Sequence, residues 1–308
     1  MIFNRQEIFS KFPWLIKKKT PMIISANYDG LICANLLHHL FQWELVGYYD
    51  QESIWISDNA IKSKKDIIWV DLNILPKQGR AIGGHIISVD GEIPQGFSSS
   101  CNPNILYNLT CNDFHAKFPF STLIFLLWLH NISLPQSILA RLLILHSDAS
   151  WLKYQHYQPN CETWISQLGD YKWKEILFDV NTKAFEKKID QILYPSLSLI
   201  NAFSGYSKLK SKILNIRSRE IVFNPDWDED IILKLSELIS NTLLWTPPSL
   251  PMIIKRIDGE KYKISVSDVK KIGLDDIIKK KKIFSYAITS PRVFSYTTFG
   301  DTKRTLLS

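Results

Sequence analysis

The stretch MIISANYDGLICANLLHHLFQW (22–43) decides the fold that we predict for this chain. Its first four residues form a short apolar run typical of a buried strand, and Gly30 then marks a turn. After the turn, Leu36, Leu37 and Leu40 recur with the spacing of one helix face. A strand, a turn and a helix in this order make half of a βαβ unit, so the stretch predicts the start of a parallel sheet.

Further strand candidates follow at short intervals along the chain. They are ELVGYY (44–49), SIWIS (53–57), IIWV (67–70) and HIISV (85–89). Their close spacing is typical of short crossovers or an added hairpin. We therefore predict an α/β fold with a mostly parallel sheet flanked by helices.

Several of the apolar runs break off at an aspartate. Asp29, Asp71 and Asp90 each follow such a run, and Asp148 follows the apolar helical stretch 137–147. In a parallel sheet the carboxyl ends of the strands share one edge, where α/β proteins bind ligands. Because grouped carboxylates repel one another unless a cation or a proton lies between them, we expect a metal site there. The simpler interpretation is that these aspartates cap helices and form turns.

The rest of the chain divides into a loop, a helical region and a small C-terminal part. A loop rich in Gly, Ser, Pro and Asn covers 91–112, and hydrophobic helices are expected at about 119–131 and 134–146. Pro247-Pro248 marks a boundary, after which short strands and turns predict an α+β module. We predict an α/β domain at 1–160, a helical bridging region at 161–244 and a second, smaller α+β domain at 245–308.

Composition favours a packed protein with a polyanionic partner. The net charge is +7 and the pI is about 9.0, which favours nucleic acid or an anionic surface. The four cysteines show neither zinc spacing nor a disulfide framework, so we expect a reduced, cytoplasmic protein. The N-terminus lacks the apolar core of a signal peptide, and the longest apolar stretch, 123–129, is too short to cross a bilayer. We expect no membrane partner.

Taken in order, the acidic motifs resemble those of the DHH phosphoesterase superfamily. Asn27-Tyr-Asp29-Gly30 opens a helix after a strand, Asp71 and Asp90 end later strands, and Asp148 follows a helix. This superfamily includes RecJ-type exonucleases, oligoribonucleases and family II pyrophosphatases. The resemblance covers about residues 20–155 and implies a metal-dependent phosphodiesterase fold.

The resemblance implies a site that holds Mn²⁺ or Mg²⁺. Carried over residue by residue, it gives Asn27, Asp29, Asp71 and Asp148 as metal ligands, and Asp71 and Asp90 as catalytic residues. The first aspartate of the first motif is Asn27 here, which removes one negative charge and weakens cation binding.

The third motif departs most from the superfamily pattern. Its Asp-His-His falls on Asp90-Gly91-Glu92, so neither histidine is present. An alternative register, Gly83-Gly84-His85, keeps the last imidazole and loses the aspartate. His85 and Glu92 are therefore further candidate ligands, and the departure puts a complete pair of metal ions in doubt.

Three other residues are candidates for supporting roles. Ser99 and Asn102, in the loop after the third motif, could bind a phosphate through side chains and backbone amides. His146, two residues before Asp148, could orient a ligand from behind.

Two functions follow from these residues. The first is a divergent DHH-like, metal-dependent phosphodiesterase or nuclease that acts on nucleic acid or oligonucleotides. The second is a catalytically inactive DHH-like module that binds nucleic acid or a protein partner. A third reading is an accessory protein whose activity requires a partner chain.

Overall fold

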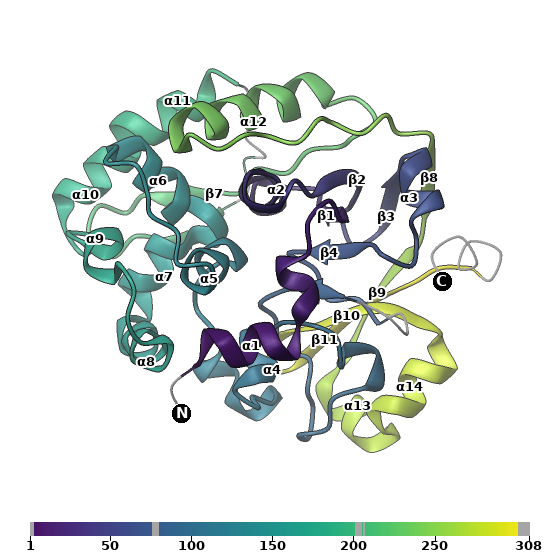
Figure 1. Cartoon of the computed structure of the whole chain (residues 1–308). Coiled ribbons are helices and arrows are strands. Elements are labelled where there is room, and N and C mark those ends of the chain that lie inside the picture. The colour runs from purple at the N-terminus through teal and green to yellow at the C-terminus, as the bar shows by residue number, and fades with distance from the viewer. Residues whose placement is uncertain (1–2, 76–79, 201–204, 206, 301–308) are drawn as a thin grey trace. The chain divides into compact units, whose positions relative to one another are not determined.

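The structure, a computed structural model, describes residues 3–75, 80–200, 205 and 207–300 (Figure 1). Contacts group the chain into two compact units, each assembled from separate segments. The first, called the helical unit here, consists of Met1–Lys11, Ala26–Leu40 and Pro119–Pro248. The second, called the sheet unit, consists of Phe12–Ser25, Phe41–Phe118 and Ser249–Ser308.

A six-stranded mixed sheet is the centre of the sheet unit, with strand order β5-β4-β1-β2-β3-β8. Its strands are β1 (Pro21–Ser25), β2 (Glu44–Tyr49), β3 (Ser53–Ile56), β4 (Ile68–Val70), β5 (Ala81–Ile82) and β8 (Lys255–Asp258). The pairs β5/β4, β4/β1 and β1/β2 are parallel, whereas β2/β3 and β3/β8 are antiparallel. The predicted α/β class with a mostly parallel sheet is confirmed.

The six-stranded sheet is apolar where it packs. The four residues of β3 and the three of β4 are all buried, as expected for strands covered on both faces. Ile23, Ile54 and Trp69 belong to one apolar cluster, in which Trp69 meets Phe284 edge to face. Short helix α3 (Asp58–Lys62) packs on β2 and β3, with Ser57 capping its first turn.

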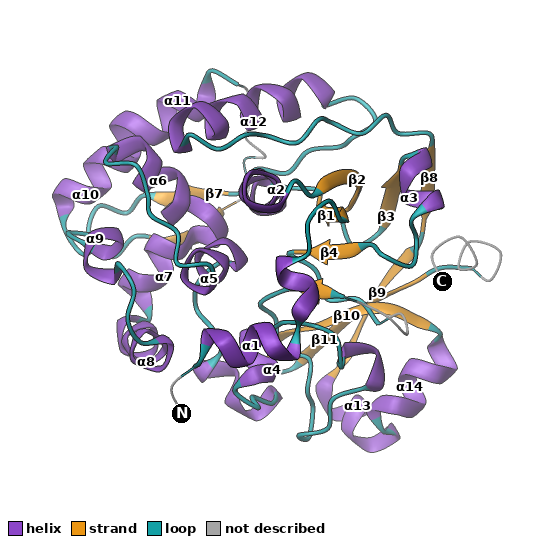
Figure 2. Ribbon diagram, in the orientation of Figure 1, coloured by secondary structure: helices purple, strands orange, loops and turns teal. Residues whose placement is uncertain are grey.

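A smaller antiparallel sheet, ordered β10-β11-β9, completes the sheet unit (Figure 2). The C-terminal elements are β9 (Glu260–Ser265), α13 (Val266–Ile272), α14 (Leu274–Lys281), β10 (Ile283–Ser290) and β11 (Val293–Thr298). Both helices pack on this sheet through an apolar cluster that contains Val269, Ile277 and Phe294. The remaining helices of the unit are short: η1 (Pro13–Ile16), η2 (Gln95–Phe97), α4 (Pro103–Leu106) and η3 (Cys111–Ala116).

The helical unit contains most of the longer helices. Its elements up to residue 177 are α1 (Arg5–Lys11), α2 (Tyr28–Phe41), α5 (Thr122–Leu129), α6 (Ile138–His146), η4 (Ser147–Ala149), α7 (Ser150–His156), α8 (Gln158–Leu168) and α9 (Trp173–Leu177). The last residue of α2, Phe41, is counted with the sheet unit. After them come α10 (Lys183–Lys188), the π-helix η5 (Ile189–Leu193), α11 (Tyr194–Ser198), the hairpin strands β6 (Ser207–Lys210) and β7 (Arg217–Arg219), and α12 (Glu229–Leu243). All eight residues of α5 are buried, so this helix lies in the core.

Most predicted elements are present, with some differences. The segment 85–89 is not a strand, because it makes only the isolated bridges Ile86 to Ile288 and Ser88 to Thr110. The fourth parallel strand is instead Ala81–Ile82, just before it. The predicted loop 91–112 contains short helices, and the predicted helix 119–131 begins only at Thr122, after the Ser121 cap.

The predicted C-terminal module contributes a strand to the large sheet. β8 lies within the segment 245–308, yet it pairs with β3 at the edge of the six-stranded sheet. The segment 161–244 is mostly helical, as predicted, and also holds the β6–β7 hairpin. The boundaries at 160 and 244 stay predictions.

Candidate functional site

In the helical unit, the first motif forms the start of α2. The Asn27 side chain accepts a hydrogen bond from the Gly30 backbone N–H at 2.9 Å, and Asp29 lies in the first helical turn. The backbone around Asn27 also pairs with the segment 221–223, through Tyr28 N–H to Ile221 O and Phe223 N–H to Ala26 O. A carboxylate in the first turn is stabilised by the helix dipole. Asn27 therefore acts as a helix cap in this structure.

Asp29 and Asp148 are brought together as predicted. Asp29 is 7% exposed, and its Oδ1 accepts hydrogen bonds from the Ser147 hydroxyl at 2.9 Å and from the Asp148 backbone N–H at 2.5 Å. Asp148 and Ala149 both have left-handed backbone, with φ of 47° and 53°. This conformation costs about 1–2 kcal/mol for a residue with a Cβ.

The ammonium group of Lys208, on β6, lies among three carboxylates. Its Nζ is 3.4 Å from Asp29 Oδ2, 3.3 Å from Asp148 Oδ1 and 3.0 Å from Glu220 Oε1. We call these four residues the lysine–carboxylate cluster. Burial alone would lower the pKa of Lys208, but the attraction of the three carboxylates outweighs burial and raises that pKa. The lysine is therefore a permanent cation at neutral pH.

His146 lines the same cavity as this cluster. It is 4% exposed and packs edge to face on Tyr28, and its Nδ1 has no hydrogen-bond partner among the residues that the structure describes. Burial lowers the pKa of His146 to about 4, although the Asp29 carboxylate acts in the opposite direction. The imidazole is therefore neutral at pH 7.

The lysine–carboxylate cluster does not fit a hydrated divalent ion. The cavity that it lines has a volume of about 10 Å³, which is near the lower limit for one water molecule. Mg²⁺ usually keeps several waters, and the Lys208 ammonium group already contacts all three carboxylates. Across the residues for which positions are given, no group of three or more His, Cys, Asp or Glu side chains is arranged to hold a metal.

The other predicted ligand, Asp71, belongs to the sheet unit. It follows β4, has a φ of 62°, and accepts a hydrogen bond from the Ser25 hydroxyl at 2.7 Å, at the end of β1. The predicted set Asn27, Asp29, Asp71 and Asp148 is thus divided between two units, and its joint binding of Mn²⁺ or Mg²⁺ stays a prediction.

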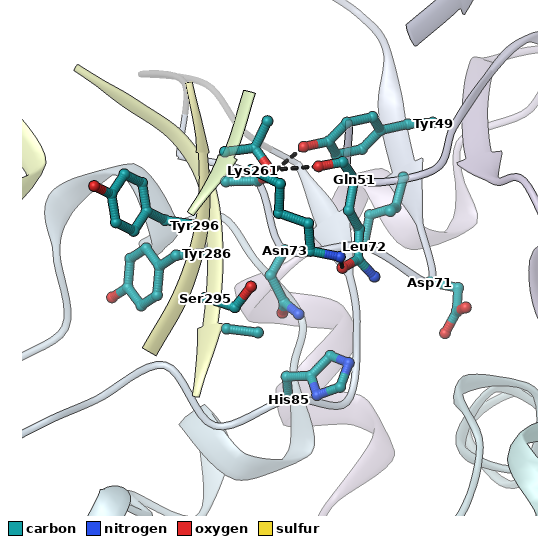
Figure 3. Close-up of a pocket in the computed structure, with 13 residues that line it drawn as sticks. Tyr49, Gln51, Asp71, Leu72, Asn73, His85, Lys261, Tyr286, Ser295 and Tyr296 are labelled. Carbon is teal, nitrogen blue, oxygen red and sulfur yellow. Dashed lines mark hydrogen bonds between the residues drawn. The ribbon is translucent and has the colours of Figure 1, made fainter. Parts of the chain in front are cut away.

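Asp71 and His85 line one polar pocket of the sheet unit (Figure 3). Its volume is about 40 Å³, enough for about three water molecules. Lys261 reaches it from β9 and donates a hydrogen bond to Gln51 at 2.9 Å. On β10 and β11, Ser285, Ala287, Ser295 and Thr297 line the pocket, while the Tyr286 and Tyr296 rings point to the opposite side of the strands.

Buried asparagines position the rim that carries His85. Asn102 is fully buried, and its amide donates to Asn73 Oδ1 at 3.2 Å and to His85 O at 2.8 Å. The Asn104 side-chain amide likewise donates a hydrogen bond to Gly84 O, at 2.7 Å. Gly83 is required here, because a Cβ at this position would lie 2.6 Å from Leu72 O. These contacts give Asn102 a positioning role, and its predicted phosphate contact stays a prediction.

The remaining candidates lie elsewhere in the sheet unit. Asp90 and Glu92 are exposed on the turn after the segment 85–89, and neither is among the described residues that line the Asp71 pocket. Ser99 is partly buried in the turn after η2. The third motif is predicted in two registers. The register Gly83-Gly84-His85 places His85 in the pocket that Asp71 also lines.

Sequence reasoning missed Lys208 and Glu220. Neither belongs to the acidic motifs, and they are far from them in sequence. A signal was nevertheless present, because 207–219 contains five basic residues and no acidic one, directly before Glu220.

Comparisons with known proteins do not assign a family. No family model, no curated protein and no solved structure matches this chain. In the described part of the chain, no helix combines the length and apolarity that a bilayer crossing requires.

Proposed function

We propose that this chain is a catalytically inactive DHH-like module that binds nucleic acid. The observation that carries the proposal is the position of the Lys208 ammonium among Asp29, Asp148 and Glu220. Two of these carboxylates are the ones that the resemblance assigns to metal binding. Two tethered ammonium groups, those of Lys208 and Lys153, pair with these carboxylates, and neither is a metal ion that could activate water.

Charge supports nucleic acid as the partner. The chain carries a net charge of +7, and a surplus of positive charge favours binding to a phosphate backbone. Lysines and arginines are exposed in both units, including Lys210 and Arg217 of the hairpin and Lys279–281 at the end of α14.

A metal-dependent phosphodiesterase is the second candidate. It is favoured by the shared pocket of Asp71 and His85, in which an acidic and an imidazole side chain accompany Lys261. In that case Asp71 would be essential for cleavage.

One assay separates the two candidates. A labelled single strand is incubated with the purified protein in Mn²⁺, and both binding and cleavage are measured. We expect saturable binding, an intact strand, and the same result in EDTA. Cleavage that disappears in Asp71→Ala and persists in the exposed control Asp58→Ala would support the phosphodiesterase and contradict the proposal.

A further inference from the structure

The β6–β7 hairpin is the most basic continuous element of the helical unit. Its basic residues are Lys208, Lys210, Lys212, Arg217 and Arg219. Lys208 is directed to the lysine–carboxylate cluster, whereas the other four are exposed. The positive charge of this hairpin therefore faces solvent.

The hairpin is fixed at its turn by a buried carboxylate. Glu186, on α10, is fully buried and accepts hydrogen bonds from the Ser211 hydroxyl and from the Leu214 backbone N–H, the latter at 2.8 Å. Ser211 also accepts from Ile213 N–H at 3.0 Å. A buried carboxylate is costly unless it is hydrogen-bonded, so these contacts hold the turn in place.

Helices α7 and α11 hold the two strands. His156 makes a hydrogen bond with Lys210 O, and Lys212 Nζ donates to His156 O at 3.3 Å. On the other strand, the Tyr194 hydroxyl donates to Arg217 O at 2.5 Å. The hairpin is thus anchored on both strands and at its turn, which reduces the entropy cost of binding a ligand.

The exposed cations of the hairpin are open to an external anion. Within the described part of the chain, Lys210, Lys212 and Arg217 form no ion pair with a carboxylate. Tyr157, next to His156, is 53% exposed, and its ring centroid is 6.1 Å from that of His156. Cations beside an exposed aromatic ring are the combination that binds single-stranded nucleic acid, through phosphates and stacked bases.

We propose that the β6–β7 hairpin, together with Tyr157, is the surface on which this protein binds single-stranded nucleic acid. This inference rests on the proposed nucleic-acid-binding function and locates it. Lys208, on β6, contributes to this surface indirectly. Its ion pairs with Asp29 and Asp148 hold β6 in place.

The test compares two triple variants of equal charge change in the full chain. The hairpin variant is Lys210→Ala, Lys212→Ala and Arg217→Ala, and the control is Lys279→Ala, Lys280→Ala and Lys281→Ala on α14. The probe is a fluorescein-labelled single strand of about 20 nucleotides, followed by anisotropy across a salt series. For single strands, each phosphate contact adds about 0.7 to the slope of log K against log salt.

Loss of three contacts therefore predicts a slope smaller by about 2 and an affinity about 100-fold lower at 0.1 M salt. The control should bind within a few-fold of wild type. A charge-retaining variant, Lys210→Arg with Lys212→Arg, should bind like wild type because it keeps both positive charges, and a loss of binding there would contradict a role for charge at these positions.

Each other outcome has a separate meaning. Equal losses in both triple variants would show that binding follows net charge and would overturn the hairpin surface. Wild-type affinity in the hairpin variant would overturn it while leaving nucleic-acid binding intact. If the wild-type protein does not bind the labelled strand, both the hairpin surface and the proposed nucleic-acid-binding function are wrong. If binding depends on the hairpin but the strand is cleaved in Mn²⁺, only the proposal that the module is catalytically inactive is wrong.

Discussion

Replacing Lys208 with methionine tests whether the lysine–carboxylate cluster depends on its internal cation. Methionine keeps the length of the apolar stem and removes the charge. The Lys208 side chain is 22% exposed and that of Asp29 is 10% exposed, so water screens their interaction only in part.

The size of the effect follows from the distances. At 3.3 Å, the separation of Lys208 Nζ from Asp148 Oδ1, one ion pair contributes about 5 kcal/mol at an effective dielectric constant of about 20. Desolvation of the charges and repulsion among the carboxylates offset much of the sum over three pairs. We expect the free energy of unfolding to fall by about 3–5 kcal/mol, as when one partner of a buried pair is removed.

Urea denaturation of the full chain at pH 7 measures this loss. Lys234→Met is the matched control, because Lys234 pairs with Asp230 on the exposed face of α12, where both side chains are more than half exposed. The control should cost no more than about 0.5 kcal/mol. If Lys208→Met costs as little as the control, the reasoning about an internal cation is wrong.

Three further predictions concern the supporting residues. Burial lowers the pKa of His146 from 6.5 to about 4, so between these pH values the unfolded chain binds a proton that the folded chain does not. The contribution of His146 to the free energy of unfolding should therefore fall by up to about 1.4 kcal/mol per pH unit as the pH drops from 6.5 to 4. His146→Phe should reduce the slope measured in urea titrations by that amount, and a slope equal to that of wild type would contradict the prediction. Asn102→Ala should lower the free energy of unfolding by about 3–5 kcal/mol in the same assay, because His85 O and Asn73 Oδ1 lose the amide that donates to them. A decrease of less than about 1 kcal/mol would contradict the role given to these hydrogen bonds. Asp71→Asn should be nearly neutral, because asparagine tolerates a φ of 62°, whereas Asp71→Ala should cost about 1–2 kcal/mol; equal stability of the two variants would refute the strain argument.

The sequence predicts local elements well where one pattern dominates. The run 22–25 and the helix after it are correct because burial and helical spacing agree over many residues. HIISV has the same apolar character as a strand, yet it forms only isolated bridges. Here tertiary pairing decides, since Ala81–Ile82 already occupies the place beside β4.

The candidate site could be predicted only in part for the same reason. Asp29 and Asp148 meet, as their positions after a strand and a helix suggest, and Asp71 directly follows β4. Lys208 and Glu220 come from a hairpin more than fifty residues farther along, so no local spacing links them to these aspartates. Their presence changes the chemistry expected from the acidic motifs, because an ammonium group with one positive charge lies where a divalent ion would bind.

The most direct measurement is a calorimetric Mn²⁺ titration of the wild-type protein and of Asp29→Asn. We expect no stoichiometric uptake by the wild-type protein, because the Lys208 ammonium group already lies among Asp29, Asp148 and Glu220, and Lys153 also pairs with Asp148. Stoichiometric Mn²⁺ binding by the wild-type protein that Asp29→Asn abolishes would contradict it.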